Sequence, residues 1–356
     1  MPRPHLLHAS LRPNAGVLLV LGGSAAAGFG YRYWATASKD TDSAAAESTT
    51  LHPALFSRYT IAAREPVSST STLFTLRARD DPAAAAQQDL RDFWRRAVWS
   101  VEAKQPQLQI ARAYTPLPPL PTSTDASAEE LRFLIRRERG GEVSGYLHRL
   151  PDGATVELRG PHVEFAVPED VREVLFLAGG TGIAPALQVA RALQMRGGET
   201  RMRILWASRR REDCVGGSSD ADNEGASGGW RRWLGLGKQE QKKDDDGEGG
   251  VKGVIVKQIE ALKRHAAPDQ QLAVDYFVDE EKSFIQPGQV AHLLQQSDKS
   301  AAGRAPGSRL ILISGPDGFL DYWSGRKVWA EEGEVQGPLR GALSRMDLKG
   351  WNVWKL

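Results

Sequence analysis

Apolar and polar positions follow two different periodicities along the chain, and these predict two folded regions. Between residues 57 and 159, short apolar runs alternate with turn residues, as in the strands of an antiparallel sheet. The predicted strands are 59–63, 72–78, 98–103, 108–113, 131–137 and 155–159. This spacing favours a small antiparallel barrel. The Ala-rich, then amphipathic residues 82–98 predict a helical insertion in it, with Phe93 and Trp94 facing inward.

From residue 171 the pattern changes to strands that alternate with helices. The predicted strands are 174–178, 203–207, 272–278 and 309–314, and the predicted helices are 185–195, 254–265, 287–295 and 318–330. This alternation is typical of a parallel sheet with helical crossovers. Residues 216–250 are rich in glycine and charge and have no periodicity, so we predict that segment 214–251 is a disordered surface insertion.

The N-terminal residues carry a third pattern. Residues 1–12 contain Arg3 and Arg12 but no acid, and residues 13–31 are uncharged. This pattern predicts a mitochondrial targeting segment (1–12), a transmembrane anchor (13–34) and a linker (35–55). A cleaved secretory signal is the alternative. The positive-inside rule places the N-terminus in the matrix or cytoplasm and the body of the protein across the membrane.

Composition limits the function classes. The hydrophobic content of 41% is that of a globular protein with a core, and the net charge of +2 gives no reason to expect nucleic acid as a partner. The single cysteine, Cys214, excludes a disulfide framework and any cysteine-based zinc or iron–sulfur site. The seven histidines lack ligand spacing, so we predict no protein-bound metal.

The candidate chemistry starts at the glycine turn 179–182 (GGTG), between a predicted strand and a predicted helix. Free backbone N–H groups and the positive end of a helix dipole would meet there, which suits a phosphate group. An ordinary turn, in which glycine only permits positive φ, explains the same residues.

Three further motifs lie at predicted element ends. Residues 112–116 (RAYTP) end a strand, residues 141–144 (GEVS) open a short helix at 144–150, and residues 314–319 (SGPDGF) join a strand to a helix. Taken singly, they also fit a surface charge, a core aromatic side chain and a helix N-cap.

In their order along the chain (112–116, 141–144, 179–182 and 314–319), the four motifs resemble those of the ferredoxin–NADP reductase superfamily, in its NADH–cytochrome b5 reductase branch. The resemblance runs from about residue 56 to residue 356. The resemblance implies an FAD-binding β-barrel domain (56–168) followed by an NAD(P)-binding α/β domain (169–356). It implies that Arg112 contacts the FAD pyrophosphate, that Tyr114 lies against the flavin ring, and that Thr115 bonds near the flavin N5. The other residues that it places beside FAD or the nucleotide are Gly141, Val143, Ser144, Gly179, Gly180, Thr181, Gly182, Pro185, Gly315, Pro316 and Trp354.

Two positions bear on activity and on the nucleotide. Ser314 stands where the family has a cysteine beside the nicotinamide. Together with Thr115, which the resemblance places near the flavin N5, it is a candidate catalytic residue. The change leaves open an FAD-binding assembly or docking factor with little reductase activity. Ser208 and Arg209 stand where relatives that prefer NADPH bind the 2′-phosphate, which favours NADPH-capable binding, although two acids follow Arg211.

The run 105–118, GPDGF at 315–319 and the N-terminal membrane segment together resemble the fungal mitochondrial cytochrome c import factors, which act in haem attachment. The resemblance implies a single-pass anchor in the mitochondrial inner membrane, with the flavin domain in the intermembrane space. It also implies electron flow from NAD(P)H through FAD to a haem or haem protein, with apocytochrome c and its haem-attachment machinery as partners. An electron donor of the endoplasmic reticulum is a further alternative.

Overall fold

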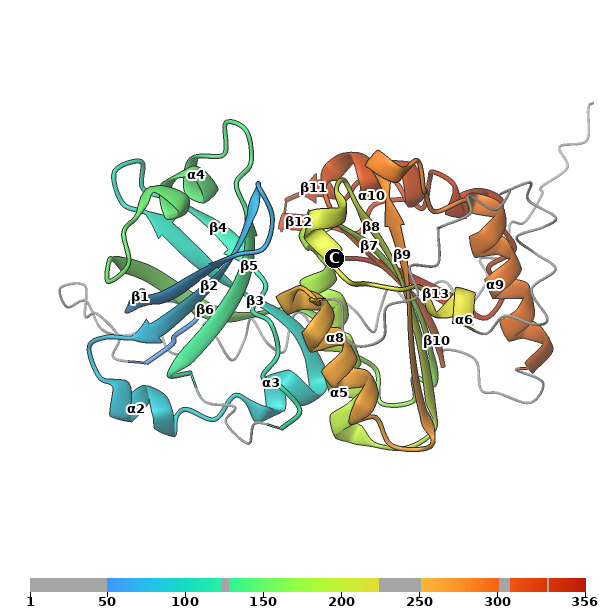
Figure 1. Ribbon diagram of the computed structural model, residues 1–356, viewed down its shortest axis with the longest axis horizontal. Helices are drawn as coiled ribbons and strands as arrows, with labels where there is room; N and C mark the ends of the chain where they lie inside the picture. Colours follow the sequence, from blue (N-terminus) through green and yellow to red (C-terminus); the bar gives the residue numbers. More distant parts are fainter. Residues whose placement is uncertain (1–49, 123–127, 224–250, 301–307, 332) are drawn as a thin grey trace, which may run out of the picture. The chain divides into compact units, whose positions relative to one another are not determined.

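The computed structural model describes residues 50–122, 128–223, 251–300, 308–331 and 333–356 (Figure 1). These residues belong to one compact unit, Glu47–Leu356. The predicted targeting segment 1–12 and anchor 13–34 lie outside the described residues, as does most of the linker 35–55. No helix among the residues described is both long enough and apolar enough to cross a membrane.

The first half of the unit is a six-stranded antiparallel sheet, as the sequence predicted. Its strands are β1 (Ser57–Pro66), β2 (Ser71–Ala78), β3 (Ala97–Gln105), β4 (Ile110–Tyr114), β5 (Glu130–Arg136) and β6 (Thr155–Ala166). Their order is β4-β3-β6-β1-β2-β5. The two outer strands meet because the chain after β4 pairs with β5, through a bridge between Pro116 and Phe133. The sheet therefore closes into a barrel.

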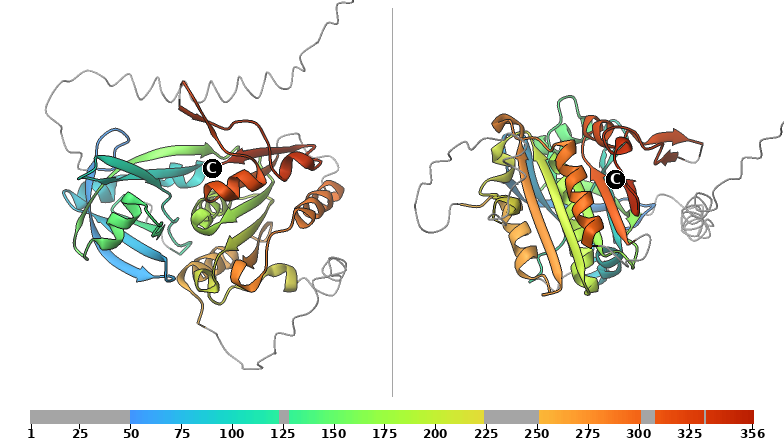
Figure 2. Two further views of the ribbon diagram at one scale, coloured as in Figure 1. Left: turned by 90° about the horizontal axis from the view of Figure 1, so that it is seen from above. Right: turned by 90° about the vertical axis from the view of Figure 1, so that its right-hand side faces the viewer.

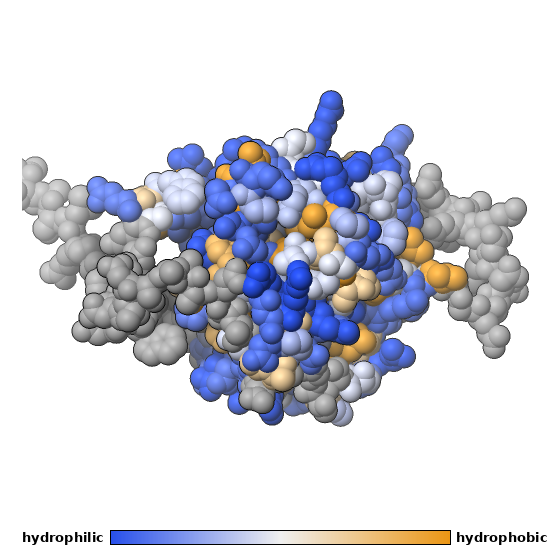
Figure 3. Space-filling view, turned by 90° about the vertical axis from the view of Figure 1, so that its left-hand side faces the viewer, coloured by the Kyte–Doolittle hydropathy of each residue, from blue (hydrophilic) through white to orange (hydrophobic). Residues whose placement is uncertain are grey.

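The barrel core is aromatic, and it extends to the inserted helices. Trp99 and Phe74 are almost completely buried. The insertion forms two short helices, α2 (Pro82–Gln87) and α3 (Arg91–Arg96), and β3 begins already at Ala97. Trp94 is buried against Trp99, with ring centroids 4.6 Å apart. It therefore faces inward, as the sequence predicted. The visible barrel face is otherwise mostly hydrophilic (Figure 3).

The second half is a five-stranded parallel sheet in the order β13-β10-β7-β8-β9. Its strands are β7 (Glu173–Gly179), β8 (Thr200–Ser208), β9 (Gln270–Val278), β10 (Arg309–Ser314) and β13 (Trp351–Lys355). Its longer helices are α5 (Ile183–Arg196), α8 (Val254–Arg264), α9 (Pro287–Ser300) and α10 (Asp317–Trp323). Every residue of β7 is buried, as expected of a central strand covered on both faces.

The helices divide between the two faces of the sheet (Figure 2). Apolar residues of α5 and α8 pack with one set of alternate strand residues, including Phe176. Residues of α9 and α10 pack with the other set, including Leu177. This arrangement brings the start of α5 and the end of β10 to the same edge of the sheet, because the carboxyl ends of parallel strands share one edge.

Two predictions for this half are wrong in part. The helix predicted at 318–330 ends at Trp323, and the chain continues into a hairpin of β11 (Val328–Ala330) and β12 (Gly333–Val335). The predicted disordered insertion is ordered over residues 214–223, with the turn Arg211–Cys214 and the helix α6 (Asp220–Asn223).

The ordered start of the insertion is held by side chains that bond the outer strand. Asp220 accepts a hydrogen bond from the backbone N–H of Val274 at 2.7 Å, and Ser219 accepts one from Tyr276 at 2.9 Å. These bonds satisfy donors of an edge strand that would otherwise be unpaired. Such bonds leave no periodic sequence signal, which is why the pattern predicted disorder.

Candidate active site

A cavity of about 360 Å³ lies between β4, β5 and the helix α4 (Glu142–Arg149) on one side and the start of α5 and the end of β10 on the other. It therefore joins the barrel to the carboxyl edge of the parallel sheet. The predicted site residues that line it are Arg112, Tyr114, Thr115, Gly141, Val143, Ser144, Thr181, Gly182, Pro185, Ser314 and Gly315. Residues from all four sequence motifs thus face one space.

Strand pairing places Arg112, Tyr114 and Thr115 at this cavity. Tyr114 is the last residue of β4 and lies opposite Val101 of β3, and the chain then leaves β3 to join β5. The Arg112 guanidinium donates to the carbonyl of Ala111 at 2.9 Å and forms no ion pair with any described residue. Burial raises the pKa of Tyr114 to about 12, so its hydroxyl stays protonated at neutral pH.

The motif at 141–144 shapes the start of α4. The helix predicted at 144–150 begins earlier, at Glu142, so Ser144 lies inside its first turn and is not the N-cap. The Ser144 Oγ instead accepts a hydrogen bond from the N–H of Glu138 at 3.2 Å. Gly140 has a φ of +77°, which only glycine adopts readily. The first turn of α4 lines the cavity with its free N–H groups, together with a hydroxyl.

The cavity also contains charged residues that the sequence motifs did not indicate. Arg136 and Glu138 line it, and their side chains form an ion pair at 3.7 Å. Glu142 lies in the first turn of α4. With Arg112, the lining has two cationic and two anionic side chains. Arg136 and Glu138 come from β5 and the loop after it, where a strand-end charge gave no reason to single them out.

Glycines of the motifs 179–182 and 314–319 let the two loops pack closely against each other. A Cβ atom on Gly182 would lie 2.3 Å from the carbonyl oxygen of Ser314, and one on Gly179 would lie 2.9 Å from the ring of Phe319. Gly180 has a φ of +55°, and its carbonyl accepts a hydrogen bond from the Trp206 indole at 2.9 Å. Close approach and positive φ therefore account for these glycines. Gly179 and Gly180 do not line the cavity.

Ser314 ends β10 and lines the cavity, while the neighbouring Pro316 begins α10 as its N-cap. Trp354, on the edge strand β13, is half-buried, and its ring lies 5.2 Å from the ring of Phe165 in β6. Neither Pro316 nor Trp354 lines the cavity. Trp354 thus connects the C-terminal strand to the barrel at a different place.

The residues predicted for the nucleotide's 2′-position lie apart from the cavity. The Ser208 hydroxyl is buried and has no hydrogen-bond partner among the described residues. Arg209 is exposed. Arg210 pairs with Glu212 at 3.2 Å, and the Arg211 Nε donates to Glu281 at 2.6 Å. The two arginines after Arg209 are therefore already neutralised.

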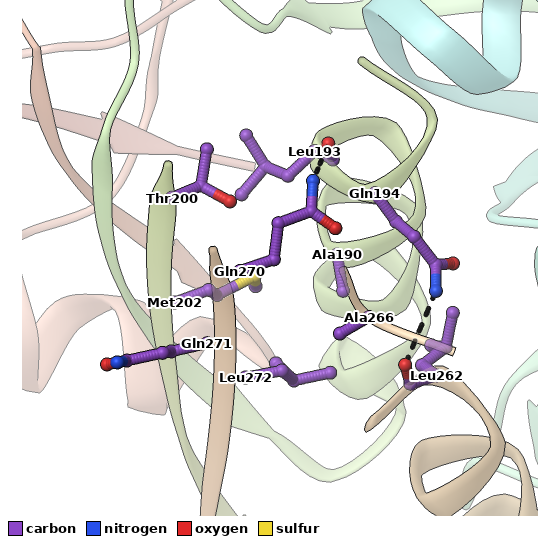
Figure 4. A pocket seen from close by; sticks show the side chains of 10 residues that line it. All are labelled: Ala190, Leu193, Gln194, Thr200, Met202, Leu262, Ala266, Gln270, Gln271 and Leu272. Carbon is purple, nitrogen blue, oxygen red and sulfur yellow. Dashed lines mark hydrogen bonds between the residues drawn. The ribbon is translucent and has the colours of Figure 1, made fainter. Parts of the chain in front are cut away.

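A second cavity, of about 20 Å³, lies at the opposite end of α5 (Figure 4). Hydrogen bonds border it, from Gln270 to the Leu193 carbonyl at 3.0 Å and from Gln194 to the Leu262 carbonyl at 3.4 Å. A space of this size holds about one water molecule. This second cavity is therefore too small to hold a cofactor.

Comparison with known proteins gives two family matches. Residues 96–167 match an oxidoreductase FAD-binding domain, and residues 176–274 match an oxidoreductase NAD-binding domain. The first match begins just before β3 and the second ends within β9, so β1, β2, β10 and β13 lie outside both.

Two relatives and one solved structure illustrate the similarity. The cytochrome c mitochondrial import factor CYC2 of Saccharomyces cerevisiae is 25% identical in an alignment of 305 residues that covers 73% of this chain and 72% of that protein. NADH-cytochrome b5 reductase 2 of Lodderomyces elongisporus is 24% identical over 65% of this chain, which spans 63% of that reductase. The cytochrome b5 reductase domain of Ulva prolifera nitrate reductase has a TM-score of 0.47 at 18% identity, over 78% of this chain and 93% of that domain.

Proposed function

We propose that this chain, in which residues 96–167 match an oxidoreductase FAD-binding domain and residues 176–274 an oxidoreductase NAD-binding domain, is an FAD-dependent NAD(P)H oxidoreductase that reduces a haem protein. The observation that supports this most strongly is the cavity at which the four motifs meet. It lies between the barrel and the sheet, where one cofactor could contact both domains.

The residues of this cavity fit a flavin dinucleotide. Arg112 has no ion pair within the described chain and could offset phosphate charge. The N–H groups at the start of α4 and the Ser144 hydroxyl could bind the same diphosphate. Tyr114 provides an aromatic wall.

FAD in this position would accept a hydride from NAD(P)H and release its electrons singly to an acceptor. In this proposal the Thr115 hydroxyl, which lines the cavity, would donate a hydrogen bond near the flavin N5, the atom that receives the hydride. Thr181, Pro185 and Ser314 also line the cavity, and in this proposal they would orient the nicotinamide ring. Trp354 holds the C-terminal strand against Phe165.

The acceptor and the location rest on the relatives and on the N-terminal pattern. The yeast relative is named for cytochrome c import in mitochondria, and the reductase relative is named for cytochrome b5. Cytochromes carry haem, so we propose a haem protein as acceptor and a role in cytochrome c haem attachment. The basic N-terminus and the uncharged stretch after it support an inner-membrane anchor with the flavin domain in the intermembrane space.

Anaerobic stopped-flow mixing of the FAD-loaded protein with NADH or NADPH tests the activity. Loss of flavin absorbance near 450 nm is the expected result. Flavin that stays oxidised in excess of both nucleotides would contradict a reductase and favour a docking role, which Ser314 would explain. Imaging a fluorescent reporter fused to residues 1–40 tests the location, and reticular rather than mitochondrial signal would contradict it.

A further inference from the structure

A completely buried glutamine joins the helix of the glycine turn to the barrel. Gln188 lies in the second turn of α5 and has no exposed surface. Its Oε1 accepts a hydrogen bond from the N–H of Trp99 at 2.9 Å. Its Nε2 donates to the carbonyl of Trp99 at 3.1 Å and to the carbonyl of Pro116 at 2.8 Å. Both amide donors are thereby used.

The Gln188 amide bonds to the backbone of Trp99 at the point where the pairing between β3 and β4 has ended. Val101 of β3 lies opposite Tyr114, so two residues further along Trp99 would face Pro116. Proline has no N–H and cannot donate to the Trp99 carbonyl. The chain therefore separates from β3 after Tyr114, and Pro116 bridges to Phe133 of β5. The Gln188 amide fills the gap and makes the two bonds that a neighbouring strand would make with Trp99.

This gap lies directly beside the candidate site. Thr115 stands between Tyr114, the last residue paired with β3, and Pro116, whose carbonyl Gln188 holds. Ala184 and Pro185, in the first turn of the same helix, line the cavity. Ala184 and Gln188 are four residues apart and share one face of α5. One helix face thus contacts both the cavity and the backbone that carries Thr115.

We propose that Gln188 is a positioning residue for hydride transfer, because its amide fixes Thr115 relative to the nucleotide side of the cavity. The inference rests on the proposed reductase function. It assigns to Gln188 no contact with cofactor or substrate. Its effect passes through the Pro116 carbonyl, so removing the amide would let the Thr115 hydroxyl shift while the cavity itself persists. Reaction rates depend steeply on such shifts.

A second buried glutamine provides a matched control. Gln258 of α8 is 2% exposed, donates to the Pro118 carbonyl at 2.8 Å and accepts from the Arg132 guanidinium at 2.8 Å. It therefore binds the same connecting segment, two residues beyond Pro116. Neither Pro118 nor Arg132 lines the cavity. Loss of either amide leaves buried backbone carbonyls without a partner, so both changes should lower stability.

The test compares Gln188→Met and Gln258→Met in the full-length, FAD-loaded protein. We expect both variants to melt at a lower temperature than wild type. We expect only Gln188→Met to change the visible absorption spectrum of the bound flavin and to slow its reduction at saturating NADH by about tenfold or more. Its apparent NADH dissociation constant should change less than threefold. Equal slowing in both variants, or a Gln188→Met rate within twofold of wild type, would overturn the inference.

Gln188→Glu provides a second variant in case Gln188→Met does not fold. A buried carboxyl group is protonated at neutral pH and can still donate one hydrogen bond, so its reduction rate should lie between those of wild type and Gln188→Met. A Gln188→Glu rate equal to wild type would show that the second donor is not needed and would contradict the inference. If NADH and NADPH fail to reduce even wild-type flavin, the proposed function fails, while the flavin spectra of the variants still decide the role of Gln188.

Discussion

The carbonyl oxygen of Ser314 lies where a side chain on Gly182 would begin, since a Cβ atom built on Gly182 would stand 2.3 Å from it. Gly182 precedes α5, and Ser314 ends β10. The next atom in the way, at 2.6 Å, is the Ser314 carbonyl carbon. Because both are backbone atoms, no side-chain rotation can relieve the contact. The two loops that follow β7 and β10 therefore fit together in this arrangement only when residue 182 is glycine.

Gly182→Ala should accordingly separate the two loops. We expect a loss of about 1–3 kcal/mol in the free energy of unfolding, as for other overpacked sites, and slower flavin reduction by NADH with FAD still bound. Gly318→Ala is the control, because a Cβ at that position of α10 meets nothing within 4 Å. Urea unfolding and stopped-flow reduction measure both effects. Equal behaviour of the two variants would contradict the packing role of Gly182.

The fold could be predicted to a large extent because its core follows two simple periodicities. Alternating or continuous apolar runs marked all six barrel strands and the central strands of the parallel sheet. One prediction that was wrong concerns residues held by side-chain to backbone bonds, namely Ser219 and Asp220 on the edge of β9. The position of Ser144 within α4 is a further case, since a serine near a helix start does not reveal which turn position it takes.

Residues of the candidate site could be predicted where they belong to a sequence motif at the end of a strand or the start of a helix. Arg112, Thr115, Thr181 and Ser314 come from motifs at element ends, and the structure places them around one cavity. Gln188 could not be found in this way. A polar residue on an apolar helix face gives no sign of which backbone groups it will meet, and its partners lie 72 and 89 residues away in sequence.

Ser314→Cys tests whether serine limits the reaction. Ser314 borders the cavity where the family resemblance expects a cysteine, and a thiol is larger and more polarisable than a hydroxyl. We expect flavin reduction at saturating NADH to become about threefold to tenfold faster, because closer contact restricts the nicotinamide. Ser314→Ala separates size from hydrogen bonding and should be slower than wild type. A Ser314→Cys rate at or below that of wild type would show that the serine does not limit turnover.

Cys214 should behave as a buried, unreactive thiol. Burial raises its pKa to about 11, although the nearby Arg211 acts in the opposite direction. Because the folded pKa exceeds the reference value of 9.0, the stability gained from keeping the thiol protonated is complete below pH 9 and is lost as the pH rises towards 11. As the only cysteine, it gives a clean signal with a thiol reagent at pH 8. We expect modification at least about 100-fold slower in the native protein than in guanidinium chloride. Rapid native modification would contradict this burial.

Charge pairing after β8 should decide the nucleotide preference. Arg210 and Arg211 are paired with Glu212 and Glu281, which leaves Arg209 as the one arginine of this run without an ion pair in the described part of the chain. A 2′-phosphate would have to compete with these carboxylates, so we expect wild type to use NADH at least as well as NADPH. Glu281→Gln removes the negative charge beside Arg211 and should raise the NADPH-to-NADH ratio of kcat/KM by about twofold to fivefold, the size of an exposed ion-pair effect. The gain should shrink at high salt, because exposed charges are screened.

Glu331→Gln, on the exposed turn between β11 and β12, is the control and should leave the ratio unchanged. An unchanged ratio in Glu281→Gln would place the 2′-position of the nucleotide away from Arg211.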